Sequence, residues 1–306
     1  ASDVYKRQVL PSGLRVWTVR HASVPVVSIT LMVRRGSACD PSALPGLASV
    51  TADMLDEGCN GLSATQVHEA LARLGAQLDT DVGADALALS ITALSRFTGR
   101  SLGLMGDMLV RPSFAEADFE RVRQLRRHRL TQLRDVPAAV AERAFVRLVY
   151  GAHPYGHATI GDAASLEAMS IDDVQGFHRA AMRPSAATLL VVGDCEHAAI
   201  CRMAGEAFDG WSGDAMAEPE PVPAASTHAR LNVIHRPGAP QSELRIGHVA
   251  VSRSTADYHA LVAMNMVLGG QFVSRLNLNL REDKGFTYGA RTGFDFRRQA
   301  GPFVLQ

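Results

Sequence analysis

A run of sequence patterns near the start of the chain occurs again in its last third. Residues 14–57 contain, in order, a strand pattern, a turn with proline, a strand rich in β-branched residues, a loop of small residues and a helix pattern. Residues 231–268 show the same order. Internal similarity of this kind predicts two copies of one α+β unit, and a length of 306 residues suits two domains.

The segment between the two copies contains the sequence EPEPVP at 218–223, in which the prolines prevent regular structure. We therefore expect a first domain over 9–210, a proline-rich linker over 211–227 and a second domain over 228–306. The sequence of the second domain stops after its next strand and lacks the helices that should cover it, so we expect this domain to be incomplete. Residues 1–8 resemble a translated scar from a sequencing library and are left out of the fold prediction.

Local patterns predict the individual elements. Ser63 is expected to cap a helix, and the alternation over 78–94 predicts a β-hairpin. Strands are also expected over 26–33, 188–193, 231–235 and 242–251. Helices are expected over 46–57, 97–109, 115–134, 165–182 with a break near Ser170, 198–208 and 255–268, with a further one ending at Tyr150.

The composition excludes several classes of protein. Hydrophobic residues make up 47% and charged residues 20%, and the 31 basic side chains equal the 31 acidic ones, so no net charge favours binding to nucleic acid. No apolar run approaches the roughly 20 residues of a membrane-spanning helix. The cysteines lack the spacing of a zinc ribbon or a disulfide framework, and we expect buried or half-buried thiols at Cys39, Cys59, Cys195 and Cys201.

Residues 268–289, LGGQFVSRLNLNLREDKGFTYG, hold the strongest candidates for chemistry. We expect the Gly269-Gly270 pair to end the preceding helix with a left-handed backbone. Arg281 then follows in a short helical turn, and Tyr288 lies seven residues later in a strand-like segment. A guanidinium and a neutral phenol placed together can bind a peptide carbonyl that becomes negative. The alternative is that Arg281 makes surface ion pairs with its acidic neighbours and Tyr288 is a half-buried strand residue.

Two histidine patterns are candidates for metal sites. His68-Glu69 begins like the HExxH zinc motif, but Ala72 stands where the second histidine is needed, so chance is the better explanation. His153 and His157 flank a Pro-Tyr-Gly turn without a neighbouring carboxylate, which favours a structural loop.

The segments described above resemble the M16 family of zinc metallopeptidases, and in particular its bacterial two-domain members related to mitochondrial processing peptidase. The resemblance rests on LPSGLRV at 10–16, PGLASVTADMLDEG at 45–58, HPYGHATIG at 153–161, LLVVGD at 189–194 and the segment at 268–289. It implies an α+β fold of the LuxS/metallohydrolase-like M16 type, in which two homologous units each contain a mostly antiparallel sheet covered by helices.

Catalytic members of the family carry an HxxEH motif, whose histidines bind zinc and whose glutamate activates water. The matching positions here are Ser49, Ala52 and Asp53, which lack both imidazoles and the base. The region that matches the third ligand, a glutamate, offers only His128 and Arg129. We therefore expect no metal and no cofactor in this chain.

The resemblance also implies a role for the second domain. In this family an arginine and a tyrosine seven residues apart hold the substrate near the scissile bond, and Arg281 and Tyr288 match those positions. In heterodimeric bacterial members one chain carries HxxEH and the other carries the Arg/Tyr pair. The leading hypothesis is a zinc-free subunit that acts on unfolded peptides with an HxxEH partner, which holds the zinc.

Two alternative hypotheses for the function remain open. A pseudopeptidase that only binds peptides or scaffolds an assembly would explain the lost zinc motif equally well, but not the Arg281 and Tyr288 pair. An autonomous enzyme that uses another metal is the third hypothesis. The sequence does not distinguish a bacterial periplasmic from a cytoplasmic location, and it does not define the peptide preference.

Overall fold

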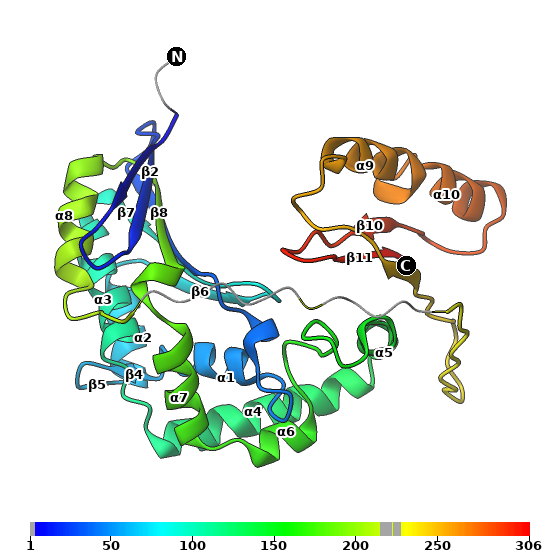
Figure 1. Ribbon diagram of the computed structural model, residues 1–306, viewed down its shortest axis with the longest axis horizontal. Helices are drawn as coiled ribbons and strands as arrows, with labels where there is room; N and C mark the ends of the chain where they lie inside the picture. Colours follow the sequence, from blue (N-terminus) through cyan, green and yellow to red (C-terminus); the bar gives the residue numbers. More distant parts are fainter. Residues whose placement is uncertain (1–3, 215–221, 223–227) are drawn as a thin grey trace. The chain divides into compact units, whose positions relative to one another are not determined.

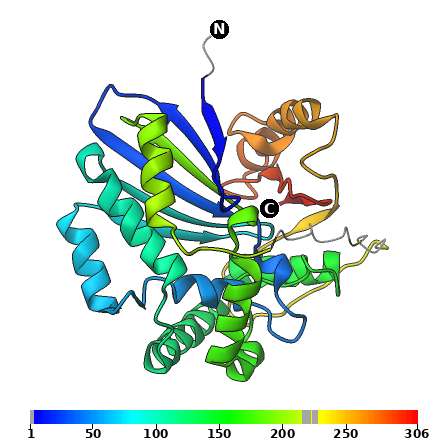
Figure 2. The same ribbon diagram turned by 60° about the vertical axis from the view of Figure 1, so that its left-hand side comes forward.

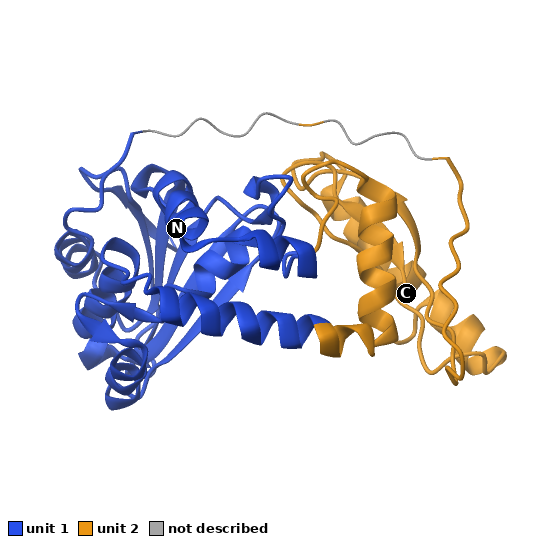
Figure 3. Ribbon diagram, turned by 90° about the horizontal axis from the view of Figure 1, so that it is seen from below, with its two compact units in different colours: residues 1–130, 159–218 blue, residues 131–158, 219–306 orange. Residues whose placement is uncertain are grey.

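A computed structural model describes residues 4–214, Val222 and 228–306. Its chain forms two compact units (Figure 3). Unit 1 contains Ala1–Leu130 and Thr159–Glu218, and unit 2 contains Thr131–Ala158 and Pro219–Gln306. The segment 131–158, which the sequence analysis assigns to the first domain, therefore packs with unit 2. Most of the linker expected over 211–227 lies outside the described residues.

Unit 1 is built on one six-stranded sheet (Figure 1). The strand order is β1-β2-β8-β3-β7-β6, and every neighbouring pair is antiparallel except β2 and β8. The sheet thus has the mostly antiparallel character expected of an α+β fold. Its strands are β1 (Lys6–Val9), β2 (Arg15–Arg20), β3 (Val26–Val33), β6 (Gln77–Val82), β7 (Leu87–Leu94) and β8 (Ala187–Gly193). Strand β1 includes residues that the sequence analysis excluded from the fold prediction.

One face of this sheet is covered by helices that enclose the larger of two cores. Helices α3 (Thr98–Val110) and α8 (His197–Ala207) lie side by side on it (Figure 1 and Figure 2). Helix α2 (Ala64–Arg73) contributes side chains to the same core. Apolar side chains that point inward from alternate strand positions meet the inner faces of the helices, because burial of apolar surface is the main force for folding. This core includes Ile29, Leu31, Leu89, Ile91, Leu189, Val191, Leu102, Met105, Ile200 and Val67.

A second core of unit 1 lies among helices. It joins α1 (Leu47–Asp53), α4 (Glu116–Arg134), α6 (Ala163–Ala168) and α7 (Ile171–Ala181). The buried side chains are Leu47, Val50, Met54, Phe119, Val122, Leu130, Leu166, Val174 and Phe177. Because this cluster fixes α1 against α4, it holds Asp53 on α1 within reach of Arg126 on α4.

Most expected elements of unit 1 are confirmed. The strand over 26–33 has the expected limits, the hairpin over 78–94 is β6 and β7, and Ser63 accepts a hydrogen bond from the Gln66 amide as the cap of α2. The helix over 165–182 is indeed divided, since Ser170 caps α7. Helix α1 is shorter than expected. It ends at Asp53 rather than residue 57, because the chain turns towards Gly58, whose φ of +130° suits glycine.

Unit 2 contains a three-stranded antiparallel sheet of order β10-β11-β9 (Figure 1). Its strands are β9 (Ile246–Val249), β10 (Thr292–Phe294) and β11 (Pro302–Leu305), and its helical segments are α5 (Pro137–Tyr150), α9 (Tyr258–Asn265), η4 (Met266–Gly270), α10 (Arg275–Asn277) and η5 (Leu278–Asp283). Helix α5 packs on β9, where a Cβ added to Gly247 would lie 2.9 Å from the Phe145 ring. This contact explains why α5 belongs to unit 2.

Several expectations for unit 2 are wrong. Residues 231–235 form no strand among the described residues, and the strand expected over 242–251 is limited to β9. The segment 286–289 is also not a strand. The pattern at 231–235 has the β-branched residues of a strand, but strand formation depends on a pairing partner, which a local pattern does not report. The strand that opens the second copy of the repeat is therefore absent from the described part of unit 2.

The described helices include none that is both long enough and apolar enough to span a membrane, as the sequence predicts.

Candidate functional site

Helix α1 carries the three positions that match the zinc motif, and two glycines and an aspartate determine where it begins. Both carboxylate oxygens of Asp40 accept hydrogen bonds at its N-terminus, from the amides of Gly46 and Ala48 at 2.7 Å each. Gly46 has a φ of +97°, and a Cβ added there would lie 2.8 Å from the Cα of Gly161. Only glycine fits this contact, which places α1 against the loop before α6.

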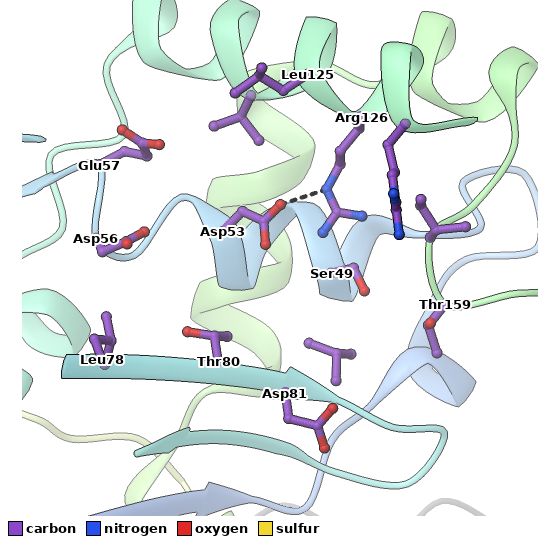
Figure 4. A pocket seen from close by; sticks show the side chains of 14 residues that line it. Ser49, Asp53, Asp56, Glu57, Leu78, Thr80, Asp81, Leu125, Arg126 and Thr159 are labelled. Carbon is purple, nitrogen blue, oxygen red and sulfur yellow. Dashed lines mark hydrogen bonds and ion pairs between the residues drawn. The ribbon is translucent and has the colours of Figure 1, made fainter. Parts of the chain in front are cut away.

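An ion pair with Arg126 occupies the last motif position. The Nε of Arg126, on α4, donates a hydrogen bond of 2.7 Å to Oδ2 of Asp53 at the C-terminus of α1 (Figure 4). The Arg126 side chain is only 13% exposed, whereas that of Asp53 is 43% exposed. The guanidinium therefore neutralises the single carboxylate that remains of the motif, in a partly dry setting where opposite charges attract strongly.

The other two motif positions provide little for a metal. Ala52 has no donor atom, and Ser49 is 5% exposed with its hydroxyl at the surface of a pocket of about 670 Å³. This pocket lies between α1, β6 and α4 (Figure 4), and its lining includes Asp53, Thr80 and Arg126. The pocket thus coincides with the degenerate motif.

Zinc in proteins is held by three or four nitrogen, sulfur or oxygen ligands. At this site the sole motif ligand, Asp53, is bound to a cation, and Ser49 offers only a neutral hydroxyl. No three histidine, cysteine, aspartate or glutamate side chains of the described chain are arranged to hold a metal ion. The residues present therefore do not fit a zinc ion.

Of the two residues suggested for the third ligand, only Arg129 lines the pocket, whereas His128 is exposed and does not. The residue that reaches the motif is Arg126, which sequence reasoning did not identify. The sequence could have pointed to Arg126 only because it lies three residues before Arg129, which places both side chains on one face of α4. That signal is weak, because α4 carries many arginines.

Two carboxylates, those of Asp56 and Glu57, lie at one end of the pocket, and each has a basic side chain beside it. Burial, followed by the charge of Glu57, raises the pKa of Asp56, whose carboxylate lies 3.8 Å from Nε2 of His68. Glu57 accepts a hydrogen bond from Arg121. His68, whose segment begins like HExxH, is thus a neighbour of Asp56 at the pocket edge.

In unit 2, Arg281 lies in η5 and is partly held by its neighbours. Its guanidinium carbon is 4.3 Å from the centre of the Phe272 ring, within the range of a cation–π interaction. Its Nη1 lies 3.5 Å from Oε1 of Glu282, so the acidic neighbour considered in the sequence analysis is present. Nη1 is nevertheless buried without a hydrogen-bond partner in the described chain, and the side chain as a unit is 32% exposed.

Tyr288 is 89% exposed and lies outside any strand, which differs from the half-buried strand residue of the alternative interpretation. Its hydroxyl makes no hydrogen bond to the residues that the structure describes. An aromatic side chain exposed to this degree leaves its phenol available as a donor to a ligand.

The segment between these two residues is fixed by Asn277, which is 4% exposed. Its Nδ2 donates to the Phe272 carbonyl at 2.7 Å, and its Oδ1 accepts from the Ala290 amide at 3.1 Å. The amide side chain therefore ties the stretch before Arg281 to the stretch after Tyr288. Sequence reasoning did not single out this asparagine.

The Gly269-Gly270 pair has a different role from the one expected. Neither glycine has a positive φ, and both belong to the π-helical turn η4. A Cβ at Gly269 would lie 2.5 Å from Oγ1 of Thr292, and one at Gly270 would lie 2.8 Å from Nδ2 of Asn265. The glycines are thus required for the close approach of η4 to β10 and α9, not for a left-handed backbone.

The histidines at 153 and 157 belong to a structural loop of unit 2. Nδ1 of His153 accepts a hydrogen bond from the Tyr155 amide at 3.0 Å, and Nε2 lies 2.8 Å from the Val222 carbonyl, so both ring nitrogens are occupied.

The cysteines are free thiols, of which Cys59, Cys195 and Cys201 are buried and Cys39 is half-buried, as expected. Burial raises the pKa of Cys59 to about 11, which makes this thiol a poor nucleophile.

The two parts of the chain match profiles of the same peptidase family. A family profile described as "Insulinase (Peptidase family M16)" matches residues 15–163, and one described as "Peptidase M16 inactive domain" matches residues 168–306. A zinc protease of Mycobacterium leprae is 23% identical over 300 residues, which cover 96% of this chain and 67% of the relative. The chain thus spans about two thirds of that relative's length.

Solved structures have the same fold. The crystal structure of the peptidase M16 inactive domain from Pseudomonas fluorescens is 25% identical with a TM-score of 0.85, and the match covers 98% of this chain and 73% of that one. A protease from Helicobacter pylori is 21% identical with a TM-score of 0.88, and the match covers 98% of this chain and 74% of that one. Together these similarities confirm the expected fold and fit a non-catalytic subunit of the M16 type.

Proposed function

This chain belongs to the M16 family of peptidases, and we propose that it is the zinc-free subunit of a heterodimeric zinc metalloendopeptidase. The partner is an M16 chain that carries an intact HxxEH motif and its zinc. The present chain contributes Arg281 and Tyr288, and the substrate is an unfolded peptide.

The observation that carries the proposal is the contrast between the two sites of this chain. The motif residue Asp53 is engaged by Arg126, whereas the Tyr288 phenol is exposed and makes no hydrogen bond to the described residues. Arg281 retains a buried Nη1 without a hydrogen bond, although its guanidinium lies over the Phe272 ring. One site has lost its capacity for metal chemistry, and the other keeps two groups with unused donors.

These donors suit the stabilisation of a peptide carbonyl. The guanidinium is charged at all relevant pH values and can bind a backbone carbonyl of the substrate. The neutral phenol donates a hydrogen bond to the carbonyl oxygen that becomes negative in the transition state, where donors fixed in advance are most effective. The tie that Asn277 makes across this segment reduces the freedom of both groups before substrate binds.

The test is reconstitution. The chain and an HxxEH-containing M16 partner are purified separately, and cleavage of an unstructured peptide is measured for each alone and for the mixture. The proposal requires cleavage in the mixture that greatly exceeds the sum of the two separate rates. A partner that is fully active alone and unaffected by this chain would refute it.

The second candidate is a pseudopeptidase that binds peptides or scaffolds an assembly without contributing to cleavage. The ion pair between Asp53 and Arg126 favours it, because a salt bridge in place of a metal can stabilise a purely structural domain. In this case the chain associates with its partner, but variants of Arg281 and Tyr288 leave the cleavage rate of the mixture unchanged.

A further inference from the structure

The sheet of unit 2 repeats one half of the sheet of unit 1. Because residues 231–268 repeat the pattern of residues 14–57, β9, α9, β10 and β11 correspond in chain order to β3, α1, β6 and β7. The strand pairing agrees with this correspondence. Strands β10, β11 and β9 are neighbours in unit 2, as β6, β7 and β3 are in unit 1, and all of these pairs are antiparallel. The pairing in unit 1 therefore indicates which strand belongs beside each strand of unit 2.

The two sheets differ on the other side of β3 and of β9. In unit 1 this side of β3 pairs with β8 from Val27 to Val33, and the two strands are antiparallel. Strand β8 pairs in turn with β2, which runs parallel to it (Figure 1). In unit 2 the corresponding side of β9 is an edge, since among the described residues β9 pairs only with β11. Unit 2 thus has an open position where unit 1 has β8.

Strand β9 is exposed beside this open position and is not protected against pairing. Ile246 is 61% exposed, whereas Ile29 of the corresponding strand β3 is fully buried. The edge of a sheet presents unpaired amide and carbonyl groups, which proteins often protect with charged side chains, proline or a bulge. The sequence of β9, IGHV, contains no proline, lysine, arginine or acid, and its register with β11 is continuous. The edge of β9 is therefore able to pair with a further strand.

The segment that corresponds to β2 also lacks a strand partner. This segment, 231–235, has the sequence LNVIH and forms no strand in the described chain. Two of its apolar side chains are strongly exposed, Leu231 at 89% and Val233 at 79%. In unit 1 the corresponding strand β2 pairs with β8. The segment 231–235 and the edge of β9 thus lack the same neighbour.

Both of these segments are held by helix α5 of unit 2. Arg230 donates a hydrogen bond of 3.4 Å to the Leu148 carbonyl near the C-terminus of α5. Arg236 donates one of 3.2 Å to the Asp135 carbonyl just before its N-terminus. These two bonds fasten the ends of 231–235, and α5 also packs on β9. One helix therefore supports both segments that would flank an added strand.

We infer that the open edge of β9 accepts one β-strand of another polypeptide chain, antiparallel to β9 and parallel to 231–235. Strand β8 shows the chemistry that such a strand needs. Its sequence, ATLLVVG, is uncharged, and most of its residues are buried between two paired neighbours. An extended peptide that joins a sheet edge gains affinity from main-chain hydrogen bonds and specificity from alternate side chains. Within the described chain β8 itself is not available, because it is paired on both sides.

The test uses a fluorescent synthetic peptide with the sequence of β8, flanked by lysines for solubility, and the full chain. Binding is measured by fluorescence anisotropy. A control peptide has the same flanks and the change Leu190→Pro, because proline removes a main-chain donor and does not fit a strand that is paired on both sides. The control should bind at least about 10-fold more weakly. Equal binding of the two peptides, or no binding of either, overturns the inference.

Two variants of the chain test the edge of β9. Ile246→Lys places a charge beside the open position and should weaken binding of the β8 peptide at least about 10-fold. The matched control is Met32→Lys, at a 39% exposed position of β3, which is paired on both sides. This control should leave the affinity within about 2-fold of the parent. Circular dichroism verifies that both variants are folded, and unchanged binding by a folded Ile246→Lys chain contradicts the assignment.

Hydrogen exchange locates the bound peptide. The amides of β9 should become protected when the peptide binds, and those of 231–235 should follow, because both segments would flank the added strand. Protection confined to β1 and β6, the edge strands of the unit 1 sheet, would overturn the inference. A parent chain that binds no peptide but forms a dimer, which Ile246→Lys disrupts, would show that a second copy occupies the edge and would also overturn it.

Discussion

Arg126 and Asp53 form a 2.7 Å ion pair between α4 and α1 at the position where M16 peptidases carry a zinc ligand. This pair joins two helices of one core and should contribute to stability. Arg126→Met removes the charge, keeps much of the stem and leaves Asp53 without its partner. We expect the free energy of unfolding to fall by about 1–3 kcal/mol, between the values for exposed and buried pairs.

The measurement for this pair is urea denaturation, with Arg127→Met as the control. Arg127 pairs with Glu167 on the exposed side of α4, so its loss should cost no more than about 1 kcal/mol. An equal effect of the two substitutions would mean that the Asp53 pair has no special structural role.

Asn277 is expected to be a positioning residue for the segment that bears Arg281 and Tyr288. Asn277→Ala leaves the Phe272 carbonyl and the Ala290 amide without their partner, which should cost about 1–3 kcal/mol. Hydrogen exchange of the Ala290 amide should become faster. Asn279→Ala, at an exposed position of η5, is the control and should leave that exchange rate unchanged. Unaltered protection of Ala290 in the Asn277 variant would contradict this role.

Two glycines of α3 should respond in opposite directions to alanine. A Cβ at Gly106 would lie 2.0 Å from the Ala207 carbonyl oxygen at the contact with α8, so Gly106→Ala must separate the helices and should destabilise unit 1 by about 1–3 kcal/mol. At Gly103 a Cβ meets nothing within 4 Å, and alanine there should stabilise by up to about 1 kcal/mol. Thermal unfolding of both variants checks the prediction, which fails if they shift in the same direction.

His178 should make stability depend on pH. Burial lowers the pKa of its imidazole from the usual 6.5, against a weaker opposite effect of its 2.9 Å contact with the Leu109 carbonyl. The unfolded chain therefore binds a proton at this group more readily than the folded chain. The stability associated with neutral His178 is present above pH 6.5 and is lost as the pH falls through the lower folded-state value.

For this group the measurement is the free energy of unfolding of the parent chain and of His178→Gln between pH 5 and pH 8. The parent should lose stability relative to the variant below about pH 6.5, by at most about 1.4 kcal/mol per pH unit for one proton. A difference between the two proteins that does not change with pH would show that His178 does not titrate in this way.

The fold could be predicted from the sequence where local patterns coincide with burial. Strand β3 alternates between buried and less buried positions along its length, so the β-branched pattern and the sheet agree. Ser63 and Ser170 cap helices because their side chains satisfy free amides within three residues, a relation visible in the sequence. The strand expected over 231–235 failed because no described strand pairs with it.

The site was less accessible to sequence reasoning. The degenerate positions Ser49, Ala52 and Asp53 could be located through the family motif, but the partner of Asp53 could not. Helix α4 carries many arginines, and only its packing against α1 selects Arg126 as the one that pairs with Asp53. The role of Gly269 was also missed, because its contact with Thr292 joins segments that are distant in the sequence.

The most direct test of the account is the rate of peptide cleavage by the assembled pair of chains with substitutions in this subunit. Tyr288→Phe removes one phenol donor and Arg281→Ala removes a whole guanidinium. Loss of even one such donor typically lowers the rate about 100- to 1,000-fold. Tyr258→Phe, which removes only the hydroxyl of a half-buried ring, and Arg275→Ala, at an exposed position, are matched controls in the same unit and should leave the rate within about 2-fold of the parent. The account predicts a large fall in kcat for the first two variants with assembly intact. Cleavage at the parent rate by both would contradict it.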